Sequence, residues 1–256
     1  MTQTRTDSHL LSKSLYDAVI FDMDGVVTDT ASLHGKAWKE MFDQFLEYHA
    51  RQTGRQQAPF DLGHDYLQYV DGKPRFDGVR SFLASRGIAL PEGSLEAPPG
   101  VDSVHALGNK KNALFGKMLE DEGAVAYPGT VQLIQKLHQA GMKTAIISSS
   151  KNAEKILRSA KVLDLFEAKV DGVDSLRLGI PGKPAPEIFL QAARELGAEP
   201  KRAVVVEDAI SGVQAGEAGG FGLVVGVNRG SDPEDLRNNG AHIVVSDLSE
   251  LDVSAT

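Results

Sequence analysis

The sequence predicts an α/β fold with a doubly wound parallel sheet that is interrupted by an inserted helical domain. Short apolar, β-branched segments typical of buried parallel strands occur at residues 16–21, 143–147, 203–206, 222–225 and 242–245. Helical patterns alternate with the later strands, at residues 130–140, 153–160, 186–196 and 210–218. Strands that alternate with helices form βαβ units, and such units build a parallel sheet.

The insertion follows the first strand. Residues 31–125 contain no segment typical of a buried strand, and helical periodicity occurs at residues 34–48, 78–86 and 101–122. We therefore expect an α/β catalytic core of residues 15–30 and 126–256, with residues 31–125 forming a helical cap. The polar segment 1–14 is expected to be a disordered tail.

Composition excludes several classes of function. The 256 residues include no cysteine, so disulfides, thiolate metal sites and a cysteine nucleophile are excluded. The net charge of −8 argues against nucleic acid as the main partner, although local cations can still bind a small anion. No apolar run approaches the ~20 residues that span a bilayer. Residues 1–14 lack the apolar part of a secretory signal, so we expect a cytoplasmic protein without membrane partners.

Acidic residues follow two of the predicted strands. Asp22 and Asp24 come at the end of the first strand, and Glu207 and Asp208 follow the segment 203–206. Ligands bind at the carboxyl ends of the strands in open parallel sheets, and carboxylates are ligands that Mg²⁺ prefers. The alternatives are an acidic turn after the first strand and an N-cap role for Asp208.

Two further loops carry groups that could bind phosphate. Hydroxyls and free N–H groups at Ser148, Ser149 and Ser150, before a helix, are suited to holding a phosphate, although a plain helix cap is the alternative. Lys183 lies between Gly182 and a proline, just before another helix. It could neutralise a phosphate there, and the alternative is an ordinary surface lysine.

In this order the motifs resemble those of the haloacid dehalogenase superfamily. Its phosphotransferases carry a nucleophilic aspartate, a second aspartate two residues on, a serine or threonine, a lysine and an acidic pair. The resemblance covers about residues 16–248 and implies a Rossmann-like core of the haloacid dehalogenase type. It implies that Asp22 is the nucleophile and a metal ligand. Asp24 would be the general acid/base, and its backbone carbonyl would bind Mg²⁺.

The same resemblance assigns the remaining motifs. Asp208 would bind Mg²⁺ with support from Glu207, while Ser148, Ser149 and Lys183 would hold the transferring phosphoryl group. The chemistry is consistent, because a carboxylate nucleophile divides a difficult transfer into two easier steps. Mg²⁺ and a lysine neutralise charge on the phosphoryl oxygens.

Finer features are similar to the β-phosphoglucomutases of this superfamily. The features are the continuation of the aspartate motif to His34 and Trp38, the serine loop with Ser150 and Asn152, the Lys-Pro-Ala-Pro motif at 183–186, and the cap segments with Arg75, Lys111 and Asn112. The resemblance implies that Arg75, Lys111 and Asn112 contact the non-transferring phosphate and that His34 couples substrate binding to Asp24. The alternatives are a solvated charge for Arg75, a buried hydrogen-bonded histidine for His34 and cap packing for Trp38.

The resemblance implies a Mg²⁺-dependent mutase that interconverts β-D-glucose 1-phosphate and glucose 6-phosphate through an aspartyl-phosphate and a bisphosphate. Such an enzyme would suit disaccharide metabolism, and its expected partner is a small phosphorylated sugar. The sequence does not give the oligomeric state, for which a monomer is favoured. A sugar-phosphate phosphatase and a non-catalytic binding module on this fold are the alternatives. The chain departs from the family pattern at the polar segment 51–59, the loop 91–100 and the long approach 173–181 to Lys183.

Overall fold

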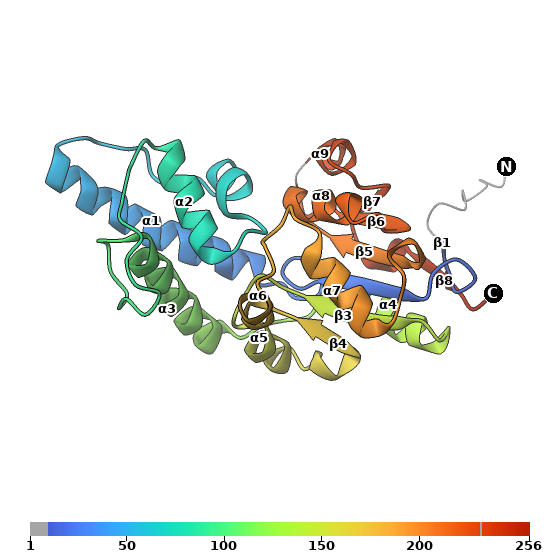
Figure 1. Ribbon diagram of the computed structural model, residues 1–256. Helices are drawn as coiled ribbons and strands as arrows, with labels where there is room; N and C mark the ends of the chain where they lie inside the picture. The colour runs from blue at the N-terminus through green and yellow to red at the C-terminus, as the bar shows by residue number, and fades with distance from the viewer. Residues whose placement is uncertain (1–9, 231) are drawn as a thin grey trace. The chain divides into compact units, whose positions relative to one another are not determined.

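The computed structural model describes residues 10–230 and 232–256, and it divides into two compact units. The α/β unit runs up to Asp29 and continues from Val125 to Thr256, while the helical unit consists of Thr30–Ala124 (Figure 1). Among the described residues, no helix combines the length and the apolar character needed to cross a membrane.

The main sheet of the α/β unit has six parallel strands in the order β4-β3-β2-β5-β6-β7. These strands are β2 (Ala18–Asp22), β3 (Lys143–Ile147), β4 (Ala168–Val170), β5 (Ala203–Glu207), β6 (Leu223–Val227) and β7 (Ile243–Val245). The strands after β2 are added first on one side and then on the other, so the strand order reverses between β2 and β5. The predicted doubly wound α/β fold is confirmed, and ligands bind outside such a reversal point in this class of fold.

Burial explains why the central strands read as continuous apolar runs. Every residue of β2 and of β5 is buried, because helices cover both faces of a parallel sheet. The last residue of each is nevertheless acidic, Asp22 in β2 and Glu207 in β5. The chain therefore places two carboxylates where adjacent buried strands end.

Helices alternate with these strands along the chain. They are α4 (Pro128–Gln139), α5 (Ala153–Ser159), α6 (Gly172–Leu178), α7 (Glu187–Leu196), α8 (Ile210–Ala218) and α9 (Pro233–Asn238), with short 3₁₀ turns η3 (Leu163–Leu165), η4 (Pro200–Arg202) and η5 (Leu248–Glu250). Helix α7 packs across β2, β3 and β4, and α8 packs on β5 and β6. Ile20, Ile147, Phe189, Val205 and Val213 belong to the core that forms beneath these two helices.

Part of the expected disordered tail is ordered, so that prediction is wrong for its last residues. Strand β1 (Leu10–Ser12) pairs in parallel with β8 (Asp252–Ser254), and Leu11 is fully buried. The pairing partner comes from the other end of the chain, so local composition could not reveal it. Residues 1–9, which the expectation also covered, lie outside the described residues. The long approach to Lys183, residues 173–181, is also largely ordered, because most of helix α6 lies within it.

The helical unit contains α1 (Ala31–Thr53), the π-helical turn η2 (Tyr66–Val70), α2 (Arg75–Ser85) and α3 (Val104–Glu122). Its core is rich in aromatic rings, including Trp38, Phe42, Phe60 and Phe82. Trp38 is nearly inaccessible and stacks on Phe42 with 5.3 Å between ring centroids. Trp38 therefore packs in the core, as the packing alternative predicted.

Candidate active site

The acidic residues predicted from the sequence meet at the point where the strand order reverses. Carboxylate oxygens of Asp22, Glu207 and Asp208 all lie within 4.8 Å of one another. Asp22 and Glu207 are buried, and Asp208 is half-buried. An all-oxygen set of this kind suits Mg²⁺ or a similar hard cation, so these residues could hold the expected metal.

The backbone at Gly25 is shaped to fit Asp208. Gly25 has φ +80°, and a Cβ at this position would lie 1.7 Å from Asp208 Oδ2. The turn is closed by a hydrogen bond of 2.9 Å from the Gly25 N–H to the Thr28 carbonyl. Only glycine combines this conformation with so close an approach. The segment that carries Asp24 therefore turns directly against the Asp208 carboxylate.

Lys183 joins the two buried carboxylates. Its Nζ donates to Asp22 Oδ1 at 2.5 Å and also makes a close contact with Glu207 Oε1. The other Glu207 oxygen accepts a 2.8 Å hydrogen bond from the Ala209 N–H. Glu207 thus orients the lysine while the loop after β5 orients Glu207. Lys183 is buried, which excludes the surface-lysine alternative.

The charges of this cluster are strongly coupled. Burial raises the pKa of Asp22 well above its usual value, and the neighbouring Glu207 and Asp24 carboxylates add to the rise, while Lys183 opposes it. Burial alone would lower the pKa of Lys183, but the Asp22 and Glu207 carboxylates outweigh it, so that the pKa is raised. The charged form of Lys183 is therefore favoured, and it faces a cluster with more acidic groups than cations, an arrangement that a bound metal ion would balance.

The serine loop follows β3, the strand that pairs with the strand carrying Asp22. Asp22 is the register partner of Ile147, so Ser148 begins the neighbouring loop one residue beyond that pair. Ser148 is buried, and its Oγ accepts a 3.0 Å hydrogen bond from the Ser150 N–H. The Ser150 Oγ in turn accepts from the Asn152 N–H at 3.1 Å. This bond uses the Ser148 oxygen only as an acceptor. The hydroxyl proton can still be donated to another group, such as a phosphate oxygen.

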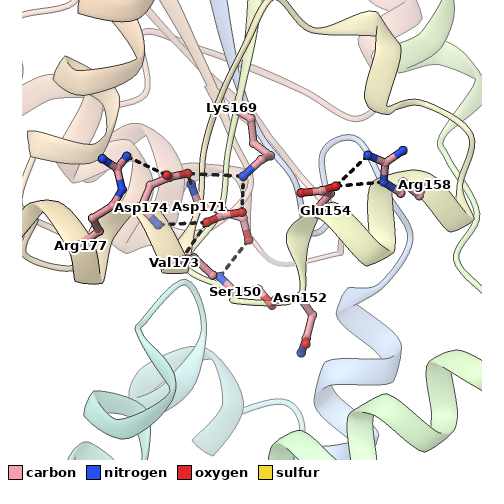
Figure 2. Close-up of polar contacts among 10 residues, drawn as sticks. Ser150, Asn152, Glu154, Arg158, Lys169, Asp171, Val173, Asp174 and Arg177 are labelled. Atoms are coloured by element: carbon pink, nitrogen blue, oxygen red, sulfur yellow. Dashed lines mark hydrogen bonds and ion pairs between the residues drawn. The ribbon is translucent and has the colours of Figure 1, made fainter.

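A capped turn after β4, which was not predicted from the sequence, supports the serine loop. The Ser148 N–H donates to the Val170 carbonyl at 3.1 Å, and the Gly172 N–H donates to the Ser150 carbonyl at 3.1 Å. Between these two bonds lies Asp171, which is buried, caps α6 and contacts Lys169 (Figure 2). The recurrence of aspartate at Asp171 and three residues later is a capping-box pattern that could have predicted this turn.

Two of the predicted cap residues meet within the helical unit. Lys111 Nζ lies 2.5 Å from His34 Nδ1, and the His34 ring stacks on Phe115 with 4.0 Å between centroids. Lys111 is buried, and its Nζ lies 5.1 Å from the centre of the Trp38 ring. His34 is thus a half-buried, hydrogen-bonded histidine, and its partner is a buried cation. Asn112 is half-buried and follows Lys111 on α3.

Arg75 is the first residue of α2 and is not a solvated surface charge. It is half-buried, and burial lowers the pKa of its guanidinium. One terminal nitrogen donates to Asn109 Oδ1 at 3.1 Å. Its Nε is buried and has no hydrogen-bond partner within residues 10–230 and 232–256. Arg75 therefore retains an unused donor.

The predicted site residues thus form two groups, one in each unit. The α/β unit brings together Asp22, Glu207, Asp208 and Lys183, with Asp24 and the serine loop in adjoining segments. The helical unit contains His34, Lys111, Asn112 and Arg75.

Comparison with known proteins identifies the family. A model of the haloacid dehalogenase-like hydrolases matches residues 16–220. A β-phosphoglucomutase of Mycobacterium bovis is 48% identical over 237 residues, which cover 91% of this chain and 90% of the relative. A fructose-1-phosphate phosphatase of Escherichia coli is 31% identical over 212 residues, which cover 82% of this chain and 95% of the relative.

A solved structure shows the same fold. The crystal structure of a β-phosphoglucomutase from Clostridium difficile aligns with a TM-score of 0.69 at 24% identity, and the alignment covers 92% of this chain and 93% of that one. The resemblance predicted from the motifs is confirmed. This chain belongs to the haloacid dehalogenase-like hydrolase family and is similar to its β-phosphoglucomutases.

Proposed function

We propose that this protein is a Mg²⁺-dependent sugar-phosphate mutase that interconverts β-D-glucose 1-phosphate and glucose 6-phosphate. The observation that carries the proposal is the buried arrangement of Lys183 between Asp22 and Glu207, beside Asp208. The 48% identity to a β-phosphoglucomutase over most of both chains supports the choice of substrate.

In the proposed mechanism, Asp22 carries the phosphoryl group. The sugar 6-hydroxyl attacks the phosphorus of phosphorylated Asp22 and gives its proton to Asp24, so that a bisphosphate forms and the Asp22–phosphate bond breaks. The bisphosphate then turns around. A carboxylate oxygen of Asp22 attacks the 1-phosphate, and Asp24 returns the proton to the departing sugar oxygen. Glucose 6-phosphate leaves, and Asp22 is again phosphorylated.

The surrounding residues would stabilise the transferring group. Lys183 and the hydroxyl of Ser148, with Ser149 beside it, would bind the phosphoryl oxygens. Asp22, Asp208 and the Asp24 carbonyl would hold Mg²⁺, with Glu207 orienting Lys183. Bound Mg²⁺ would neutralise charge on the phosphoryl oxygens.

The helical unit would act as the cap and bind the phosphate that is not being transferred. Arg75 has a buried, unused donor and a guanidinium suited to phosphate. Lys111, Asn112 and His34 would contribute from the same unit, and Ser150 and Asn152 from the serine loop of the other. Exclusion of water by a cap would protect the aspartyl-phosphate from hydrolysis. The monomeric state and cytoplasmic location stay predictions.

A phosphatase is the second candidate, because a fructose-1-phosphate phosphatase is also a relative of this chain. The two are separated by incubating the protein with Mg²⁺, β-glucose 1-phosphate and a trace of glucose 1,6-bisphosphate. Glucose 6-phosphate without an equal release of phosphate supports the mutase. Free phosphate as the only product supports the phosphatase, and no turnover of any phosphate ester would indicate a non-catalytic binding module.

The cap assignment has its own test in Arg75→Ala. Loss of a charge-assisted hydrogen bond to phosphate should lower mutase kcat/KM by about 10- to 100-fold. Hydrolysis of acetyl phosphate, which has no second phosphate, should be nearly unchanged. Full mutase activity in the variant would refute the role of Arg75.

A further inference from the structure

The loop of residues 91–100, one of the departures from the family pattern, is fastened to the start of α3. The Val104 N–H donates to the Pro91 carbonyl at 3.0 Å, and the His105 N–H donates to the Glu92 carbonyl at 3.0 Å. The His105 ring also bonds the Gly93 carbonyl at 2.9 Å. These contacts hold the first part of the loop in one conformation against the helix.

Asn109 connects the remainder of this loop to Arg75. Its Nδ2 donates to the Leu95 carbonyl at 3.0 Å and to the Ala97 carbonyl at 2.8 Å. Its Oδ1 accepts from an Arg75 terminal nitrogen at 3.1 Å. Two carbonyl acceptors on one side and a guanidinium donor on the other allow only this orientation of the amide. Asn109 therefore transmits the position of the loop to the arginine.

The packing of Arg75 leaves little other freedom for its side chain. A Cβ at Gly108 would lie 3.4 Å from Arg75 Cγ and 2.6 Å from the Phe76 ring, so glycine there lets both side chains lie directly on α3. The Arg75 guanidinium lies 4.7 Å from the centre of the Phe76 ring. The contacts with Phe76 and Asn109 therefore hold the guanidinium in one position, and its buried Nε has no hydrogen-bond partner among the described residues.

We propose that Asn109 is a positioning residue for phosphate recognition, which orients Arg75 and through which the loop 91–100 influences substrate binding. This inference rests on the proposed function, because it deepens the role given there to Arg75. An arginine that is oriented before the ligand arrives loses less conformational freedom on binding. The loop thus contributes to affinity for the non-transferring phosphate without contacting it.

The test compares Asn109→Ala with the unaltered protein in two reactions. We expect KM for β-glucose 1-phosphate to rise by about 10-fold with a smaller change in kcat, because one hydrogen bond to a charged group is lost. Acetyl phosphate hydrolysis, which depends on the α/β unit, should be unchanged. Gln52→Ala removes an exposed amide from α1 of the same unit and should change neither reaction.

A double-mutant cycle decides whether Asn109 acts through Arg75. If it does, Asn109→Ala has no further effect on KM once Arg75→Ala is present. An equal 10-fold effect in both backgrounds, or no effect in either, overturns the inference. Calorimetric binding of glucose 1,6-bisphosphate to Asp22→Asn protein gives the same cycle without turnover. If the unaltered protein releases only free phosphate, the proposed mutase activity is contradicted. The role of Asn109 can still be tested in that case, because the calorimetric cycle does not depend on turnover.

Discussion

Replacing Lys183 by methionine should destabilise the metal-free protein severely. Lys183 lies 2.5 Å from Asp22 and also contacts Glu207, and all three side chains are at most 9% exposed. Methionine fills a similar volume but leaves two buried carboxylates without their cation. Removing one partner of a buried ion pair costs about 3–5 kcal/mol, because the remaining charge stays buried.

Urea unfolding followed by circular dichroism in EDTA measures this loss. With a typical urea dependence, a cost of this size should lower the midpoint by roughly 1–2 M. EDTA is needed because a bound cation would partly replace the lysine. Lys136→Met, at an exposed position in the last turn of α4, serves as the control and should change stability by less than about 0.5 kcal/mol.

The stability lost in Lys183→Met should also depend on pH. Without Lys183, burial and the Glu207 charge should raise the pKa of Asp22 even further, so the folded variant binds a proton more tightly than the unfolded chain. Its stability is then fully retained below the usual carboxyl pKa near 4 and falls as pH rises above it. In the unaltered protein the Asp22 pKa is also raised, though less, so the gap between the two proteins should widen as the pH rises above the Asp22 pKa of the unaltered protein. A variant as stable as the parent at pH 7 would refute the buried, charged cluster.

Two further predictions test other contacts. Gly25→Ala should raise the Mg²⁺ concentration for half-maximal activity by about 10-fold or more, because its Cβ would displace Asp208 and its φ of +80° is strained. Gly54→Ala, with a similar φ of +72° but no atom within 4 Å, should leave that concentration unchanged, and an equal shift in both variants would contradict the Asp208 contact. Arg86→Met should cost about 2–3 kcal/mol in urea unfolding at pH 7, because it removes a 2.5 Å ion pair to the buried Asp65. Burial alone would raise the pKa of Asp65, but hydrogen bonds, including that from Arg86, hold it below its usual value, so this stabilisation is lost as pH falls below about 4. An Arg86→Met deficit that does not shrink at all as the pH is lowered from 7 into the acid range would contradict this account.

Elements with a strong local pattern were predicted well from the sequence. The central strands that end at Asp22 and Glu207 are continuous apolar runs, and both were identified from residue type alone. Strand β4 was missed because a segment of three residues, Ala168–Val170, is too short to show a period. Strand β1 was missed because only pairing with β8, from the far end of the chain, makes it a strand.

In the candidate site, too, the residues that could be predicted belong to local motifs, and those that were missed depend on long-range packing. The sequence predicts metal and phosphate chemistry because Asp22, Asp24 and the acidic pair stand at or just beyond the ends of recognisable strands, and Lys183 stands just before a helix. The sequence did not reveal that Asp171 supports the serine loop or that Asn109 bonds Arg75, because these bonds depend on how loops pack. Neither residue belongs to a motif that carries the chemistry.

By itself the sequence determined the fold class and the placement of acidic residues at the ends of two strands, and it predicted a hard cation for them, whereas the strand order and its reversal point came from the structure. The features that the sequence determined follow from strand periodicity and from the chemistry of residues at strand ends, both of which are local. Only the tertiary structure decided that Lys183 bonds both Asp22, 161 positions away, and Glu207, and that Lys111 bonds His34. The physical reason is that strand register and helix packing set these distances, and they arise from the burial of side chains along the whole chain.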